Sequence, residues 1–286
     1  MDTLSSCVEK IILRHGSRGM TRIRRRLKSG YCQRAARLIL DNPGVVLIGT
    51  GFPVAGSFES DGPIGAIALY QVLLHLNYEP TIVCAPPISK IMSRSFETYE
   101  LPIVGWNESK KAVEVALRKL KPSLVISVER AGVTERGRYY NMHGEDITRF
   151  TAKFDLFFKY GNCPTIAFGD GGNEIGMGNV YDALKAMNTV PSVTTCDELV
   201  ISTVSNWGVY GVVALMSHHL QKDLFALIDP EAIASHLVEN GCVDGITRRQ
   251  ELSEDGFPIT VGVSIINKLR NLAHLKNSRD RKGDKH

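Results

Sequence analysis

The sequence lacks the usual marks of secreted, zinc-binding and membrane-spanning proteins. Its 6 cysteines are scattered without a C-x-x-C pair, which argues against a disulfide framework or a zinc knuckle. No apolar run reaches the roughly 18 residues that a membrane-spanning helix needs, and the N-terminus has no signal-peptide core. We therefore expect a cytoplasmic protein. The arginines between Arg14 and Arg26 also fit a mitochondrial transit peptide, so the matrix is the alternative in a eukaryote.

A strong excess of one charge is also missing. Lys and Arg number 34 against 30 for Asp and Glu, which gives a net charge of +4. Basic residues gather at 22–28 and in the tail at 276–286, but no aromatic residues interleave with them as in nucleic-acid-binding surfaces. We interpret both clusters as solvated, and we expect neither nucleic acid nor a membrane as a partner.

Nucleotide-binding motifs are absent too, since neither G-x-G-x-x-G nor a P-loop occurs. What the sequence does contain is an alternation of short apolar runs and helical patterns. The expected strands are 45–48, 81–84, 124–128, 165–168 and 199–204, with a short one at 102–104. The expected helices are 64–76, 110–120, 207–220, 231–239 and 264–275. This alternation predicts a three-layer α/β/α fold with a mainly parallel, Rossmann-like sheet.

Acidic residues follow several of the predicted strands. The carboxyl ends of parallel strands share one rim of the sheet, where ligands bind in folds of this class. Carboxylates gathered there repel one another unless a cation joins them, and no histidine accompanies these acids. The pattern predicts a site for Mn²⁺ or Mg²⁺, with Ca²⁺ also compatible. The acids concerned are Glu59, Asp61, Glu129, Asp170 and Glu174.

Each of these acids also has a purely structural interpretation. Asp61 precedes Pro63 and could cap the helix that begins there. Glu129 could pair with a neighbouring arginine, and Asp170 and Glu174 could be incidental members of a glycine-rich turn. We prefer a site because all the acids are expected on the same rim.

Small and polar residues follow the same strands. Glycines allow backbone N–H groups to approach a ligand closely, and helix N-termini favour anions. We therefore expect a substrate- or anion-binding set comprising Thr50, Gly51, Gly62, Gly171, Gly172, Asn173, Ser205 and Asn206.

Basic and aromatic candidates gather in a long polar loop, 130–148. Arg130 offers a bidentate partner for a substrate carboxylate. Tyr139 and Tyr140 could hydrogen-bond substrate or anchor the loop, and Asn141 and His143 follow them.

Several segments together resemble one known family, the C-terminal domain of D-glutamate cyclases. They are 50–52, 59–63, 129–132, 139–141, 169–178, 205–208, 243–247 and 255–258. The resemblance runs from about residue 16 to 272 and implies a single cyclase-like α/β domain over 1–286, with a charged tail at 276–286. In mitochondrial members this domain follows a hydro-lyase-like domain, which we do not find in these residues. Where the family leads us to expect a histidine, this chain has Gly262.

The resemblance implies a lyase that converts D-glutamate to 5-oxo-D-proline and water. In that hypothesis Glu59, Asp61, Asp170 and Glu174 hold the metal, Glu129 is the base and Arg130 clamps the substrate's α-carboxylate. Tyr139, Tyr140 and Asn141 complete the catalytic set. Two alternatives stay open, a manganese-dependent phosphatase and a non-enzymatic domain that binds a small acidic metabolite. A homo-oligomer is compatible with the sequence.

Overall fold

The central feature of the computed structural model is a six-stranded sheet in the order β5-β4-β1-β6-β7-β8, in which every pair of neighbours is parallel. The structure describes residues 3–16, 18–54, 56–187 and 189–283, with side chains through residue 273. In sheet order the strands are Thr98–Glu100, Glu79–Cys84, Val45–Gly49, Leu124–Val128, Thr165–Gly169 and Glu198–Ile201. The expected three-layer α/β fold is confirmed.

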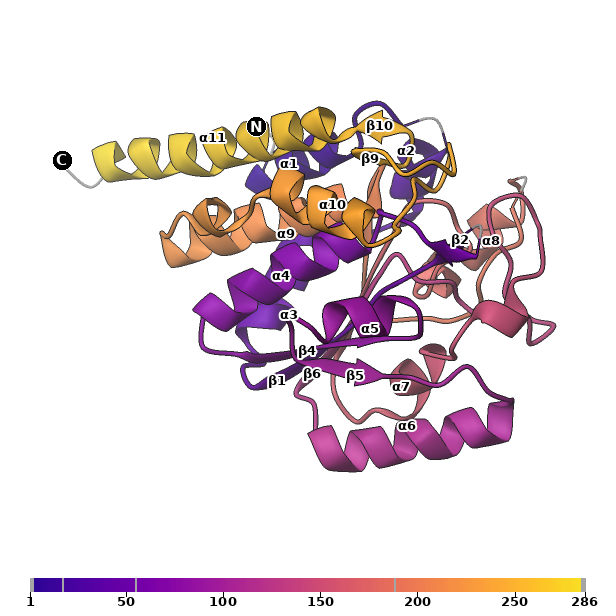
Figure 1. The fold of residues 1–286 in the computed structure, drawn as a ribbon. Helices are drawn as coiled ribbons and strands as arrows, with labels where there is room; N and C mark the ends of the chain where they lie inside the picture. The colour runs from indigo at the N-terminus through magenta and orange to yellow at the C-terminus, as the bar shows by residue number, and fades with distance from the viewer. Residues whose placement is uncertain (1–2, 17, 55, 188, 284–286) are drawn as a thin grey trace.

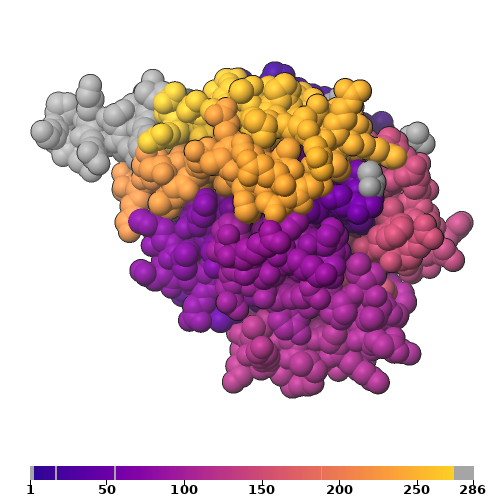
Figure 2. All heavy atoms as spheres, in the orientation of Figure 1, coloured from indigo at the N-terminus to yellow at the C-terminus, as the bar shows by residue number. Residues whose placement is uncertain are grey.

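Helices cover both faces of the sheet (Figure 1). On one face, α4 (Pro63–His75) and α9 (Ser205–Leu220) lie directly on the strands. Further helices pack outside them: α1 (Leu4–Ile12), α10 (Pro230–Glu239) and α11 (Ile259–Gly283). This explains why α4 and α9 are apolar almost all round, since a helix between a sheet and an outer layer has little surface left for solvent. In Figure 2 the yellow and orange C-terminal helices form the upper surface of the molecule.

The opposite face carries α6 (Trp106–Leu120), which is amphipathic, and α7 (Asp155–Tyr160). The remaining helices and 3₁₀ turns are α2 (Met20–Ile23), α3 (Tyr31–Leu40), α5 (Ile88–Met92), α8 (Tyr181–Leu184), η1 (Arg24–Arg26), η2 (Thr148–Phe150), η3 (Met177–Val180) and η4 (Leu224–Leu227). Two short hairpins complete the fold: β2 (Pro53–Val54) with β3 (Ser57–Phe58), and β9 (Ser253–Glu254) with β10 (Phe257–Pro258). In the described part of the chain, no helix combines the length and apolar character needed to cross a bilayer.

Several expected boundaries are wrong. The edge strand lies at Thr98–Glu100 and not at 102–104, because Pro102 has no N–H with which to continue the ladder to β4. The stretch 202–204 lies outside β8, because α9 already begins at Ser205. The last helix begins at Ile259, before the expected 264, and its backbone stays helical through Gly283, into the predicted tail.

Candidate active site at the carboxyl ends of the strands

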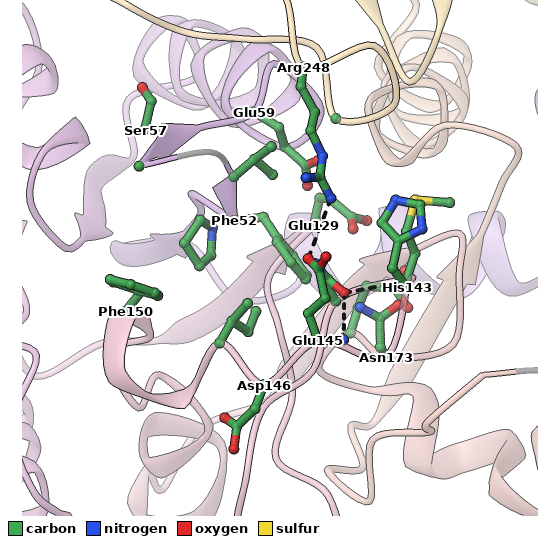
Figure 3. A pocket seen from close by; sticks show the side chains of 18 of the residues that line it. Phe52, Ser57, Glu59, Glu129, His143, Glu145, Asp146, Phe150, Asn173 and Arg248 are labelled. Atoms are coloured by element: carbon green, nitrogen blue, oxygen red, sulfur yellow. Dashed lines mark hydrogen bonds and ion pairs between the residues drawn. The ribbon is translucent and has the colours of Figure 1, made fainter.

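A pocket of about 380 Å³ opens at the carboxyl-terminal rim of the sheet. Its walls come from the segments after β1, β4, β6 and β7, together with loop 141–150 and the segment before β10 (Figure 3). One wall is apolar and includes Phe52, Pro86 and Phe150. Carboxylates lie on the remaining walls, namely Glu59, Glu129, Glu145, Asp146, Glu174 and Asp255. The pocket therefore lies on the rim that the sequence predicted.

Three acids meet at the inner end of the site. Asp61, Glu129 and Asp170 each offer a carboxylate oxygen, and these oxygens lie within 4.8 Å of one another. Asp61 follows β3, while Glu129 and Asp170 directly follow the central strands β6 and β7. All three are buried, and Glu129 adopts a left-handed backbone conformation with φ +42° that a non-glycine residue rarely adopts. The sheet thus brings three predicted site acids together.

The N-terminus of α9 points at this triad. The Ser205 N–H donates to Asp61 Oδ2 at 2.8 Å and to Asp170 Oδ2 at 3.1 Å, and the Asn206 N–H donates to Asp61 Oδ1 at 2.9 Å. The positive end of a helix dipole stabilises such carboxylates. Asp61 therefore caps α9 and not α4, which has Gly62 at its N-cap position.

The triad carries more negative charge than its surroundings neutralise. Burial raises the pKa of Asp61 to about 6. Burial first, and then neighbouring carboxylates, raise the pKa of Glu129 well above its usual range. Burial likewise raises the pKa of Asp170, and its Oδ1 has no hydrogen-bond partner within the described residues. Buried carboxylates with an unused oxygen are the environment in which a hard divalent cation binds.

Arg18 was not predicted as a site residue. Its Nη2 lies 2.7 Å from Asp170 Oδ2, and it also forms an ion pair with Asp255. Burial lowers the pKa of Arg18, but the charges of Asp170, Glu129 and other carboxylates outweigh this and raise the pKa above its ordinary value. Nothing in the sequence indicated this role, because Arg18 belongs to the arginine-rich stretch 14–26 that we considered only as a possible transit peptide.

Glu174 closes the glycine-rich turn on itself. Its Oε1 accepts from the Gly171 N–H and its Oε2 from the Gly172 N–H, both at 2.6 Å. Burial raises the pKa of Glu174 to about 7. Glu174 lines the pocket beside the triad, but the prediction that Gly171 and Gly172 present free N–H groups to an anion is wrong.

Asn206 and Gly62 lie in the interior and not at the pocket. Asn206 Oδ1 accepts from the N–H groups of Gly62 at 2.9 Å and Gly65 at 2.7 Å, and its Nδ2 donates to Glu254 Oε2 at 2.8 Å. The amide therefore ties the start of α4 to the start of α9. These contacts contradict the predicted substrate contacts of both residues. Ser205 is instead held by Glu129, whose Oε2 accepts from its hydroxyl at 2.6 Å.

Arg130 does not clamp a substrate in this arrangement. Its side chain is buried, and its Nη1 donates to the carbonyl oxygens of Thr50 at 2.6 Å and Gly51 at 3.2 Å. Its Nη2 donates to the Ala152 carbonyl at 2.9 Å. The guanidinium thus joins the end of β1 to the segment before α7, behind the pocket wall. The predicted clamp is wrong, and Thr50 and Gly51 serve as acceptors for Arg130.

The two tyrosines of the long loop anchor it. Tyr139 is buried and its hydroxyl donates to Asp155 Oδ2 at 2.7 Å, which supports the structural alternative. The Tyr140 carbonyl accepts from Asn173 Nδ2 at 3.0 Å. Asn173, expected to bind substrate, and Asn141, expected in the catalytic set, line the pocket, whereas the two tyrosines lie outside its lining.

Glu59 reaches the pocket from the segment after β3. Its side chain is 8% exposed, and burial raises its pKa well above the usual range. Its carboxylate accepts no hydrogen bond within the part of the chain that the structure describes. Glu59 therefore lines the pocket with a raised pKa and without a hydrogen-bond donor from the described residues to hold its carboxylate.

Comparison with known proteins identifies the family of this chain. Residues 8–270 match the family described as D-glutamate cyclase-like, C-terminal. The human protein named D-glutamate cyclase, mitochondrial, is 33% identical in a match that covers 78% of this chain and 44% of the human protein. The chain thus spans less than half the length of that relative. On this match, the chain belongs to the D-glutamate cyclase-like C-terminal family.

Proposed function

We propose that this protein is a metal-dependent lyase that converts D-glutamate to 5-oxo-D-proline and water. The observation that carries the proposal is the buried triad of Asp61, Glu129 and Asp170, which adjoins an acid-lined pocket in a chain of this family. No comparable feature favours a phosphatase, because Glu174 occupies the glycine N–H groups that a phosphate would need.

The triad would hold Mn²⁺ or Mg²⁺. Its oxygen donors suit a hard cation, and the unpartnered Asp170 Oδ1 supports this fit. When bound, such a cation would polarise the γ-carboxylate of the substrate. This assignment moves Glu129 from the predicted role of base to that of a ligand, because its oxygen lies within the triad.

Glu59 is then the best candidate for the base. Cyclisation forms a bond between the amine nitrogen and the γ-carbon and breaks one carbon–oxygen bond of the γ-carboxylate. The ammonium group loses two protons, and the departing oxygen gains two to leave as water. Glu59 lines the pocket outside the triad and burial raises its pKa, so its carboxylate can accept these protons from nitrogen and return them to the leaving oxygen.

The decisive experiment measures product and metal binding in the same protein. With Mn²⁺ present, we expect 5-oxo-D-proline from D-glutamate and no phosphate release from p-nitrophenyl phosphate. Substituting a residue that only positions a metal ligand typically weakens metal binding by roughly 10–100-fold. Asp170→Asn removes a ligand, so it should weaken Mn²⁺ binding by more than this and abolish product. The matched control is Asp182→Asn in α8, outside the pocket lining. Full activity of Asp170→Asn, or phosphate release without cyclisation, would overturn the proposal.

A further inference from the structure

Arg248 lies at the mouth of the pocket, on the segment between α10 and β9. Its side chain is 44% exposed, and Figure 3 shows it pointing into the pocket toward Glu145. The distance from Nη2 to Glu145 Oε2 is 3.4 Å, which is long for an ion pair of this kind. Within the described residues this is its one side-chain bond, so most of its five N–H donors are unspent.

The backbone that carries Arg248 is fixed, although its side chain is not. Asp244 Oδ1 accepts from the Ile246 N–H at 2.8 Å, and Oδ2 accepts from Ser253 Oγ at 2.7 Å and the Gly256 N–H at 2.8 Å. The Arg248 N–H donates to the Asp244 carbonyl at 2.9 Å, and its φ of +59° is left-handed. A strained residue on a well-bonded loop suits a side chain that must be presented in one direction.

An acidic substrate needs a cation in this pocket. Arg18 lines the pocket, but it is paired with Asp170 and Asp255. Arg130 bonds main-chain carbonyls behind the wall. Among the described residues that line the pocket, Arg248 differs from Arg18 because its guanidinium has one partner, the half-exposed carboxylate of Glu145. Exchanging Glu145 for a bidentate ligand therefore costs little.

We propose that Arg248 binds the α-carboxylate of D-glutamate and thereby determines substrate specificity, while Glu145 holds the guanidinium between turnovers. This assignment rests on the proposed function. Binding exchanges the 3.4 Å ion pair with Glu145 for a bidentate pair with the substrate. The γ-carboxylate is then left for the triad end of the site, where Glu129 belongs to both the triad and the pocket wall.

The test compares two ligands that differ in that one group. 4-Aminobutyrate has the amine and the remote carboxylate of D-glutamate but lacks the α-carboxylate. Titration calorimetry with Mn²⁺ should show that wild-type protein prefers D-glutamate by about 10–100-fold, as expected for a charge-assisted bidentate contact. Arg248→Gln should abolish this preference. Arg249→Gln should keep it, because the neighbouring Arg249 is exposed and lies outside the pocket lining.

Glu145→Gln gives a prediction of opposite sign. It frees the guanidinium from its competitor, so D-glutamate should bind several-fold more tightly while 4-aminobutyrate binding is unchanged. If Arg248→Gln keeps the preference for D-glutamate while product still forms, the assignment of Arg248 is overturned and the proposed reaction stands. If the preference depends on Arg248 but no 5-oxo-D-proline forms, the reaction fails and the assignment stands. If neither ligand binds the wild-type protein, both the assignment of Arg248 and the proposed function are overturned.

Discussion

The hydroxyl of Ser205 lies 2.6 Å from Glu129 Oε2, although the two residues are 76 positions apart in the chain. Ser205 is the first residue of α9, and Glu129 is the first residue after β6. The contact fixes a carboxylate that belongs to the triad and also lines the pocket. Because the same serine donates its N–H to Asp61 and Asp170, the start of α9 orients all three acids.

Ser205→Ala should lower kcat by about 10-fold while the fold is retained, since the backbone N–H contacts remain and only the Glu129 orientation is lost. Steady-state kinetics and metal titration on the purified variant would measure this. Ser217→Ala is the matched control, because Ser217 is a buried serine of the same helix whose hydroxyl accepts from the Leu224 N–H at 3.3 Å, outside the pocket lining. Equal losses of activity in both variants would contradict the prediction.

A second prediction separates the base from the metal ligands. Glu59→Gln keeps the shape of the side chain but cannot take a proton, so kcat should fall by about 100-fold or more. Mn²⁺ affinity should stay within about 3-fold of wild type, because Glu59 lies outside the triad. If Mn²⁺ affinity collapses together with kcat, Glu59 is a ligand and not the base.

Arg130 should matter for stability and not for substrate binding. Arg130→Lys cannot satisfy the Thr50 and Ala152 carbonyls together, so unfolding free energy should fall by about 2 kcal/mol or more. Urea denaturation would measure this loss, and D-glutamate affinity of the folded fraction should remain within about 2-fold. If Arg130→Lys had normal stability and weakened D-glutamate binding, Arg130 would bind the α-carboxylate of the substrate, as the sequence predicted.

The sheet was predictable because its signals are local. The strands β1, β6 and β7 are short apolar runs that end in glycine or precede an acid, and the rim location of the acids follows from parallel topology alone. The edge strand was predicted in the wrong place. The apolar run at 102–104 begins with a proline, which ends the pairing with β4. Local composition therefore predicted the layers of the fold, but not the position of every strand along the chain.

The site was harder to predict because long side chains can turn away from their neighbours in sequence. Arg130 follows Glu129, yet its guanidinium passes behind the wall to reach Thr50. Arg18 reaches Asp170 from near the N-terminus, and no spacing rule connects them. Sequence patterns thus identified the acids, which are positioned by their strands, and missed the arginines, which are positioned by tertiary contacts.

Stability of the metal-free protein should depend on pH through buried acids such as Glu254. Burial raises the pKa of Glu254 to about 7, so between its unfolded value near 4.5 and about 7 the folded state holds a proton that the unfolded state has released. Stability therefore falls as pH rises through this window, by up to about 1.4 kcal/mol per pH unit for one group. Chemical denaturation with EDTA from pH 5 to 8 should show the fall, and Glu254→Gln should reduce its slope by the contribution of that one group. A stability that rises over this range would contradict the prediction.

Gly262 provides the space that Glu254 occupies. The Glu254 carboxylate accepts from Trp207 Nε1 at 2.7 Å and from Asn206 Nδ2 at 2.8 Å, and a Cβ on Gly262 would lie 2.2 Å from its Oε1. Where the family resemblance leads us to expect a histidine, this chain therefore has no room for a side chain while Glu254 is in place.

Gly262→Ala should consequently destabilise the protein, even though alanine is worth about 1 kcal/mol more than glycine inside a helix such as α11. Overpacking against a buried carboxylate costs about 1–3 kcal/mol. It should also disturb the bond from Asn206 Nδ2 to Glu254, which orients the amide whose Oδ1 accepts from the start of α4. In a Glu254→Ala background the same substitution should cost nothing or stabilise, because the overlapping atoms are gone. A double-mutant cycle by urea denaturation measures this coupling, and additive effects would show that Gly262 and Glu254 do not constrain each other.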